Sequence, residues 1–161
     1  MIFLRTEEEV ELIRKSSLLV AKAHAEVAKM IKPGITSLQL DQRAEEFIRD
    51  NGGCPAFKGY SGFPNSLCIS PNDQVVHGIP NNKPFKEGMI LSIDCGVLMD
   101  GYYGDSAYTY TIGQVDVEIQ KLLDITKESL YKGIEQAVVG KRVGDIGFAI
   151  QQYVSGSRIK I

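Results

Sequence analysis

Residues 92–108, SIDCGVLMDGYYGDSAY, contain the strongest folding signal of the sequence, the dipeptide Asp100-Gly101 between two strand-like runs. An Asp-Gly pair in this setting is typical of a two-residue β-hairpin turn, because both turn positions need positive φ angles. With this turn, residue 99 pairs with residue 102, so that Gly96 faces Asp105 and Asp94 faces Ala107. The stretch therefore predicts a long antiparallel hairpin whose register is set by its turn.

The two aspartates that follow from this register are expected to share one face of the sheet. Side chains alternate along a strand, so Asp94 and Asp105 would be diagonal neighbours with Cβ atoms roughly 7 Å apart or slightly less. A four-residue loop gives the same result, whereas a loop with an odd number of residues would place the carboxylates on opposite faces. Carboxylates at this range leave room for divalent cations between them.

Asp94 lies in the apolar run Ile90–Cys95, which is expected to be largely buried. An ionised carboxylate is costly to bury unless it is paired or binds a metal. The alternative is a structural aspartate that accepts hydrogen bonds from backbone N–H groups or binds a lysine. Hard oxygen ligands favour Mn, Mg, Co or Fe, and mixed nitrogen and oxygen ligands would admit Zn.

The segments on either side of the hairpin predict amphipathic helices. Capping boxes at Thr6 and Thr36 begin the first two, and Asp116 begins the third. His24 falls within the first helix and is expected to be a structural or surface residue. Helices are expected over residues 7–32, 37–50, 117–139 and 143–154.

Between residues 54 and 113 the helical pattern is replaced by short runs of β-branched and aromatic residues, which predict strands. The order of two helices, an antiparallel sheet and two further helices predicts an α+β fold with helices covering one face of the sheet. We assign residues 1–154 to one domain and residues 155–161, which carry no packing pattern, to an irregular tail. The expected strands are residues 67–70, 75–76, 89–98 and 102–112.

The composition argues against several classes of function. The 161 residues carry a net charge of -2, which gives no basis for binding nucleic acid. No apolar run approaches the roughly 20 residues that a membrane span needs, and the N-terminus lacks the pattern of a signal peptide. Cys54, Cys68 and Cys95 are an odd number without CxxC spacing, so a reducing, cytoplasmic location is expected.

Two further segments carry candidate functional residues. His77, in the run VVHGIP, is either a loop or core histidine bound to a carbonyl or, beside a metal, a group that binds substrate or transfers a proton. Three rings, those of Phe57, Tyr60 and Phe63, lie in a Gly-rich segment with Cys68 close behind. Such rings either cover the edge of a core or line a small apolar slot beside the hairpin, and we favour the slot.

Three stretches together resemble type I methionine aminopeptidases: FKGYSGFPNSLCIS at residues 57–70, NDQVVHGIP at residues 72–80 and the hairpin at residues 92–108. The resemblance covers residues 1–154 and corresponds to the N-terminal half of that family's catalytic domain. The paired aspartates alone are shared with prolidase- and creatinase-like proteins of the same fold. The architecture that the resemblance implies is one half of the creatinase/aminopeptidase "pita-bread" fold.

The resemblance also implies an activity, the metal-dependent removal of the N-terminal methionine from peptides and nascent proteins. Asp94 and Asp105 would be metal ligands, with Asp105 bridging up to two ions of Co, Mn, Fe or Zn. His77 would be a catalytic residue near the scissile amide. The pocket for the methionine side chain would be lined by Phe57, Tyr60, Phe63 and Cys68.

The family pattern continues into a second half, which supplies two histidines and two glutamates, and nothing after Val154 matches it. Two carboxylates offer at most about four oxygens, too few for two ions that each need roughly four to six ligands. We therefore expect little or no activity from this truncated chain alone. The alternatives are a non-catalytic peptide-binding or interaction module, and a half-domain that associates with a copy of itself or with a separate second half.

Overall fold

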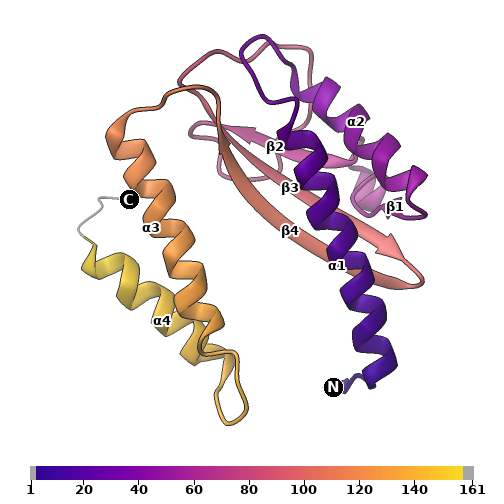
Figure 1. Cartoon of the computed structure of the whole chain (residues 1–161), viewed down its shortest axis with the longest axis vertical. Helices are drawn as coiled ribbons and strands as arrows, with labels where there is room; N and C mark the ends of the chain where they lie inside the picture. Colours follow the sequence, from indigo (N-terminus) through magenta and orange to yellow (C-terminus); the bar gives the residue numbers. More distant parts are fainter. Residues whose placement is uncertain (1–2, 158–161) are drawn as a thin grey trace. The chain divides into compact units, whose positions relative to one another are not determined.

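The structure, a computed structural model, describes residues 3–157 and divides the chain into two compact units (Figure 1). The first unit is Met1–Gln114 and the second is Val115–Ile161. No helix of the described residues is long and apolar enough to cross a membrane. The candidate site residues predicted from the sequence all belong to the first unit.

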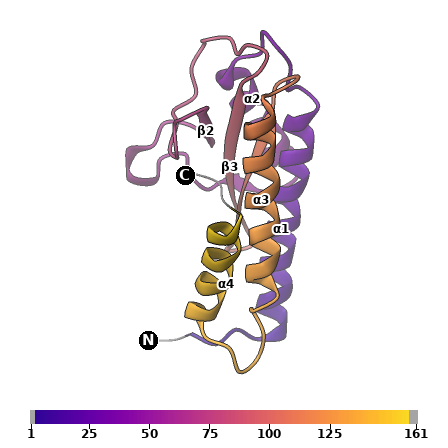
Figure 2. The same ribbon diagram turned by 90° about the vertical axis from the view of Figure 1, so that its left-hand side faces the viewer.

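The first unit is an antiparallel four-stranded sheet with two helices on one side (Figures 1 and 2). Its strand β3 (Ile90–Met99) pairs with β4 (Tyr102–Thr111) along its whole length and with the other two strands on its other edge. The predicted α+β class is confirmed for this unit. Its remaining elements are α1 (Glu7–Ala28), α2 (Ser37–Asp50), β1 (Cys54–Pro55) and β2 (Leu67–Pro71).

The hairpin of β3 and β4 has the predicted turn and register. Asp100 and Gly101 both have positive φ angles, 51° and 82°, as a two-residue turn between twisted strands requires. Gly96 lies opposite Asp105, and Asp94 lies opposite Ala107. The turn therefore contains an even number of residues, as predicted, and this number places both aspartates on the same face.

The core lies between one face of β3 and the two helices. Alternate residues of the strand, from Leu91 to Val97, are at most 1% exposed, and the side chains of Leu19, Leu40 and Ile48 from the helices are 0–4% exposed. Burial of each such side chain contributes about 1.5–3 kcal/mol relative to leaving it in water. Because the side chains of a strand alternate, the opposite face of β3 is left for polar residues.

The helix starts are as predicted, whereas one helix end is not. Both capping boxes are present, with Thr6 bound to Glu9 and Thr36 bound to Gln39. However, α1 ends at Ala28, several residues before the proline that was expected to stop it. The chain turns there through i→i−3 hydrogen bonds, so that Met30 and Ile31 pack against the core from a loop instead of from a helix.

His24 of α1 is a buried structural residue. Its Nε2 lies 2.9 Å from the carbonyl oxygen of Ser106, and its Nδ1 lies 3.1 Å from the hydroxyl of Tyr110. A carbonyl only accepts, so Nε2 carries the proton. The single proton of the Tyr110 hydroxyl can be donated to Nδ1 or to the carbonyl oxygen of His24, which lies 3.3 Å away. Burial lowers the pKa of His24, which keeps this ring neutral and suits it to hold α1 against β4.

The prediction of a strand at residues 75–76 is wrong. Residues 72–80 form a loop that lies against β2, where the backbone N–H of Ile69 donates to the carbonyl of Gly78. The N–H of Gly78 donates to the hydroxyl of Ser70 instead of to a backbone carbonyl. His77 has a φ of 59°, which turns the chain out of an extended conformation and prevents a continuous ladder.

The second unit consists of α3 (Val117–Ile134) and α4 (Val143–Gly156), which pack against each other. A Cβ at Gly133 would lie 2.8 Å from Cδ1 of Ile150, which shows how closely the helices approach. α3 ends at Ile134, not at residue 139, because the next bonds tighten to the i→i−3 type.

The irregular tail expected from residue 155 is also corrected. α4 continues through Gly156. The helix was expected to end earlier because the apolar pattern gives no signal for its last turn. Residues 158–161 of that expected tail lie outside the described residues.

We predict that Gly104→Ala destabilises the first unit by about 1–3 kcal/mol, the usual cost of overpacking. A Cβ at this position would lie 2.5 Å from the backbone nitrogen of Ser17, so α1 would have to move away from β4. Gly147→Ala in α4 is the control, since the added Cβ has no atom within 4 Å apart from its chain neighbours and the backbone of its own helix. Urea unfolding of both variants measures the effect, and an unchanged free energy for Gly104→Ala would contradict the packing described here.

Candidate metal centre

The hairpin places Asp94 and Asp105 on the face of the sheet that the helices do not cover. The neighbours of Asp94 along the strand, Ile93 and Cys95, point into the core, so Asp94 points to the opposite face. Asp105 lies opposite Gly96, two residues further along β3, and therefore shares the face of Asp94. The negative charge of Asp105 raises the pKa of Asp94, which places the two carboxylates within electrostatic range of each other.

Asp94 has a raised pKa and a carboxylate oxygen without a hydrogen-bond partner among residues 3–157. Burial raises its pKa to about 6, and the negative charge of Asp105 adds to the increase. Its Oδ1 is buried and has no hydrogen-bond partner among residues 3–157. A buried carboxylate oxygen without a hydrogen-bond donor is unfavourable, so binding of a proton or a cation would stabilise this atom.

His77 and Cys68 lie beside the carboxylates. Cys68 is directly opposite Asp94 in the pairing of β2 with β3. Burial, followed by the charges of Asp94 and Asp105, raises the pKa of the Cys68 thiol to about 11, so it stays protonated at neutral pH. A charge on His77 lowers the pKa of Asp94, which places the imidazole within electrostatic range of that carboxylate.

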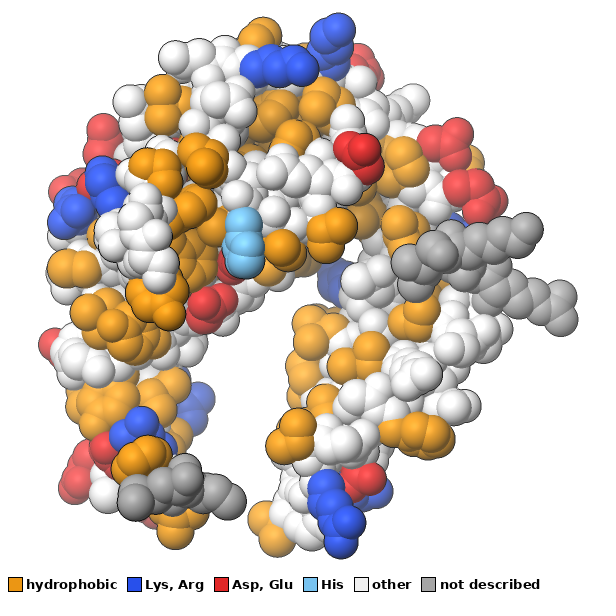
Figure 3. Space-filling view, turned by 180° about the vertical axis from the view of Figure 1, so that it is seen from behind, with side chains coloured by type: hydrophobic (Ala, Val, Ile, Leu, Met, Phe, Trp, Pro, Cys, Tyr) orange, Lys and Arg blue, Asp and Glu red, His pale blue; other side chains and the backbone are white. Residues whose placement is uncertain are grey.

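The aromatic segment, residues 57–63, precedes β2 and lies partly against the same face. A Cβ at Gly96 would be 2.5 Å from Cε1 of Phe57, so the phenyl ring covers the strand between the positions of Asp94 and Leu98. Phe63 is partly buried, whereas Tyr60, in a short 3-10 turn (η1, Tyr60–Gly62), is 76% exposed. In Figure 3, hydrophobic side chains on the first unit border a histidine and acidic side chains.

The ligands that the described residues offer fit a metal only in part. The orphaned Oδ1 of Asp94 and the adjacent carboxylate of Asp105 are hard donors of the kind that divalent cations bind. Within residues 3–157, however, no group of three or more His, Cys, Asp and Glu side chains is placed to hold one ion. A cation held between the two aspartates would therefore need further donors from water, substrate or other residues.

One buried carboxylate near the start of β2 was not predicted from the sequence. Asp41 of α2 is 3% exposed and accepts hydrogen bonds from the backbone N–H groups of Ser66 and Leu67. The signal was present in the sequence, because Asp41 follows Leu40 and lies one turn before Glu45 on the buried side of an amphipathic helix. A carboxylate in that position needs a partner from another element.

Comparisons with known proteins find relatives of nearly the whole chain. The sequence profile of metallopeptidase family M24 matches residues 11–160. Methionine aminopeptidase 1 of Bacillus subtilis (strain 168) is 46% identical over 161 residues, which are 100% of this chain and 65% of that protein. Methionine aminopeptidase of Clostridium perfringens is 45% identical over the same length and coverage. The chain therefore spans less than two thirds of the length of these relatives.

Solved structures extend the likeness to the fold. The crystal structure of methionine aminopeptidase from Rickettsia prowazekii has a TM-score of 0.95 at 38% identity and covers 97% of this chain and 63% of that chain. Prolidase from Pyrococcus furiosus has a TM-score of 0.86 at 22% identity over 96% of this chain and 44% of that chain, a likeness of fold alone. The architecture is thus that part of the pita-bread fold which these proteins share.

We predict that Asp105→Asn moves the pKa of Asp94 down from about 6 toward the ordinary value of 3.8 in metal-free protein. The substitution removes the negative charge that disfavours ionisation of Asp94, while burial keeps part of the increase. Carboxyl 13C NMR titration measures the change. Asp50→Asn, at the exposed end of α2, is the control and should leave Asp94 unaffected. An Asp94 pKa that is the same in both variants would show that the two hairpin carboxylates are not neighbours.

Proposed function

The chain belongs to metallopeptidase family M24, and from that premise we propose that it takes part in the metal-dependent release of N-terminal methionine from peptides and nascent chains. The observation that carries the proposal is the buried, unpartnered Oδ1 of Asp94 beside the carboxylate of Asp105. A metallopeptidase holds its metal through anionic oxygens that lie close together. Asp94 Oδ1 has no hydrogen-bond partner among residues 3–157, and the charge of Asp105 lies within electrostatic range of it.

Each residue around the carboxylates has a role in this proposal. Asp94 and Asp105 would hold a divalent cation, Co, Mn, Fe or Zn, and Asp105 would also help to hold a second ion where further ligands are supplied. The cation, when bound, supplies Lewis-acid activation of water and of the scissile carbonyl. His77 donates a hydrogen bond to the substrate or transfers a proton beside the scissile amide.

The apolar residues next to the carboxylates form the slot for the methionine side chain. Cys68 is held neutral by its raised pKa, so it offers the slot a polarizable sulfur without a charge. Phe57 forms the wall against Gly96, and the rings of Tyr60 and Phe63 complete the slot when a substrate is present. We also propose a cytoplasmic location, in which the three unpaired cysteines stay reduced.

We predict that the protein binds Mn²⁺ in calorimetric titration and that Asp94→Ala and Asp105→Ala abolish the heat, whereas Asp50→Ala retains it. Release of methionine from the peptide Met-Ala-Ser with Mn²⁺ is then expected to stay close to the rate of the Asp94→Ala variant. The reason is that two carboxylates supply at most about four oxygens, fewer than a complete pair of ions needs.

The outcomes of this experiment distinguish a complete metal site from structural carboxylates and from a non-catalytic peptide-binding module. Metal-dependent methionine release that Asp94→Ala abolishes would show that the chain supplies a complete site. Equal Mn²⁺ binding by the wild type and both alanine variants would make the carboxylates structural. Binding of Met-Ala-Ser without metal and without cleavage would favour a non-catalytic peptide-binding module.

A second candidate, association with another copy of the chain, is favoured by the outer edge of β4. Among residues 3–157 no strand pairs with that edge, and Tyr103 and Ala107 on it are exposed. Unpaired strand edges are templates for pairing with another chain. We predict that such pairing doubles the 17.7 kDa mass in light scattering and that Ala107→Pro, which introduces a residue unable to donate, restores the monomer. A monomer at high concentration would exclude this candidate.

A further inference from the structure

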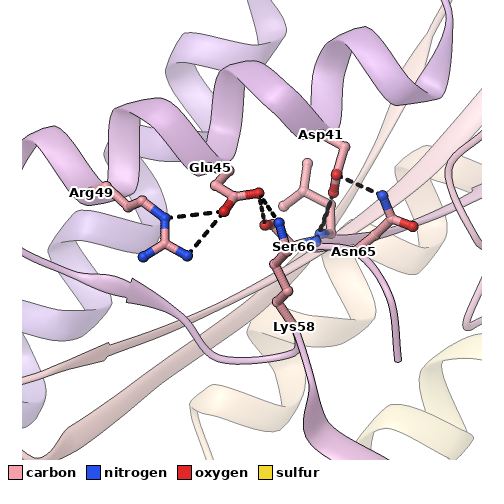
Figure 4. Close-up of polar contacts among 7 residues, drawn as sticks. Asp41, Glu45, Arg49, Lys58, Asn65 and Ser66 are labelled. Atoms are coloured by element: carbon pink, nitrogen blue, oxygen red, sulfur yellow. Dashed lines mark hydrogen bonds and ion pairs between the residues drawn. The ribbon is translucent and has the colours of Figure 1, made fainter. Parts of the chain in front are cut away.

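Helix α2 carries two carboxylates that hold the segment leading into β2 (Figure 4). Asp41 Oδ1 accepts from the backbone N–H groups of Ser66 and Leu67 at 2.9 and 2.7 Å, and Oδ2 accepts from the Asn65 side-chain amide at 2.8 Å. No lysine or arginine contributes to these bonds. Asp41 thus uses its charge to fix the backbone that immediately precedes Cys68.

The second carboxylate, Glu45, lies one helical turn further along α2 and holds the other end of the same segment. Its Oε2 accepts from Lys58 Nζ at 2.6 Å and from the hydroxyl of Ser66 at 3.0 Å (Figure 4). Its Oε1 binds the guanidinium of Arg49. The hydrogen bond from Lys58 lowers the pKa of Glu45, so the carboxylate is charged at neutral pH.

The segment between these anchors, residues 58–66, has little regular structure of its own. Gly59, Ser61 and Gly62 all have positive φ angles, 87°, 48° and 82°. Its internal backbone hydrogen bonds are those of turns, apart from the bond between the N–H of Gly59 and the carbonyl of Phe63. A segment of this kind is held in one conformation by what surrounds it more than by its own bonds.

The anchors also connect α2 with the carboxylates of the hairpin. Leu67, whose N–H is held by Asp41, pairs with Cys95, and the next residue, Cys68, pairs with Asp94. The charge of Asp41 contributes to the raised pKa of the Cys68 thiol, which places the two side chains within electrostatic range. The position of the aromatic segment relative to Asp94 is thus determined through α2.

We propose that Asp41 and Glu45 are positioning residues that hold the two ends of residues 58–66 and thereby set the shape of the apolar slot and its preference for methionine. The proposal rests on the proposed function, in that residues 57–68 are taken to line the slot. Neither carboxylate touches the substrate. Asp41 acts through Asn65, Ser66 and Leu67. Glu45 acts through Lys58 and Ser66.

The test uses Glu45→Gln, which keeps the shape of the side chain and removes its charge. Glu26→Gln is a matched control, because Glu26 on α1 is equally sheltered, 19% exposed against 21%, and also binds two cations, Lys29 and Arg43. Lys58→Met breaks the same anchor from the other side. Since Lys58 is 44% exposed, this variant keeps the core intact.

Hydrogen exchange provides the first measurement. We expect amides of residues 59–63 to exchange about tenfold faster in Glu45→Gln and Lys58→Met, the change expected for the loss of one hydrogen bond to a charged group. Amides of β3 should exchange as in the wild type, and Glu26→Gln should leave residues 59–63 unchanged. Unchanged exchange in the Glu45 and Lys58 variants would overturn the proposal.

Peptide selectivity in the presence of Mn²⁺ provides the second measurement. The preference for Met-Ala-Ser over Ala-Ala-Ser, measured by calorimetry, should fall about fivefold in Glu45→Gln and Lys58→Met and stay constant in Glu26→Gln, since part of the charged hydrogen bond's contribution is lost. Faster exchange with unchanged selectivity would overturn the positioning role. A wild type without any preference for methionine would instead overturn the proposed function of the slot, whereas the exchange data would still decide whether α2 holds the segment.

Discussion

The register between β3 and β4, which the two-residue turn at Asp100-Gly101 sets, is the constraint on which the first unit depends. The turn sets the parity of the hairpin, and one residue more or less would exchange the faces of one strand relative to the other. With the observed parity, the apolar residues from Leu91 to Val97 enter the core, and both aspartates lie on the opposite face. The register that buries the core residues of β3 therefore also places the two aspartates on one face.

The same constraint explains why the carboxylates are costly in the absence of a cation. Asp94 is placed between two buried neighbours, so it cannot leave its position without moving the strand. Its raised pKa and unpartnered Oδ1 follow from that position and from the charge of Asp105. The hydrophobic core thus supplies the free energy that keeps two like charges together, and a bound cation would remove their repulsion.

Helix α2 has two functions in this arrangement. Leu40, Ala44 and Ile48 pack it into the core, and Asp41 and Glu45 extend from it to the segment that precedes β2. Because one rigid element carries both sets of contacts, the position of the aromatic segment is coupled to the packing of the core. A Gly-rich segment can then serve a binding site without a regular structure of its own, since its ends are tied to a helix.

The sequence by itself determined the hairpin, its register and the helix starts, because an Asp-Gly turn, alternation and capping boxes act through neighbours close along the chain. It placed Asp94 and Asp105 on one face for the same reason. Tertiary structure alone decided that Val75 and Val76 lie in a loop against β2, that α1 ends at Ala28, and that Asp41 binds a segment more than twenty residues away. These outcomes depend on which distant groups compete for each backbone N–H and carboxylate, and local patterns carry no information about that competition.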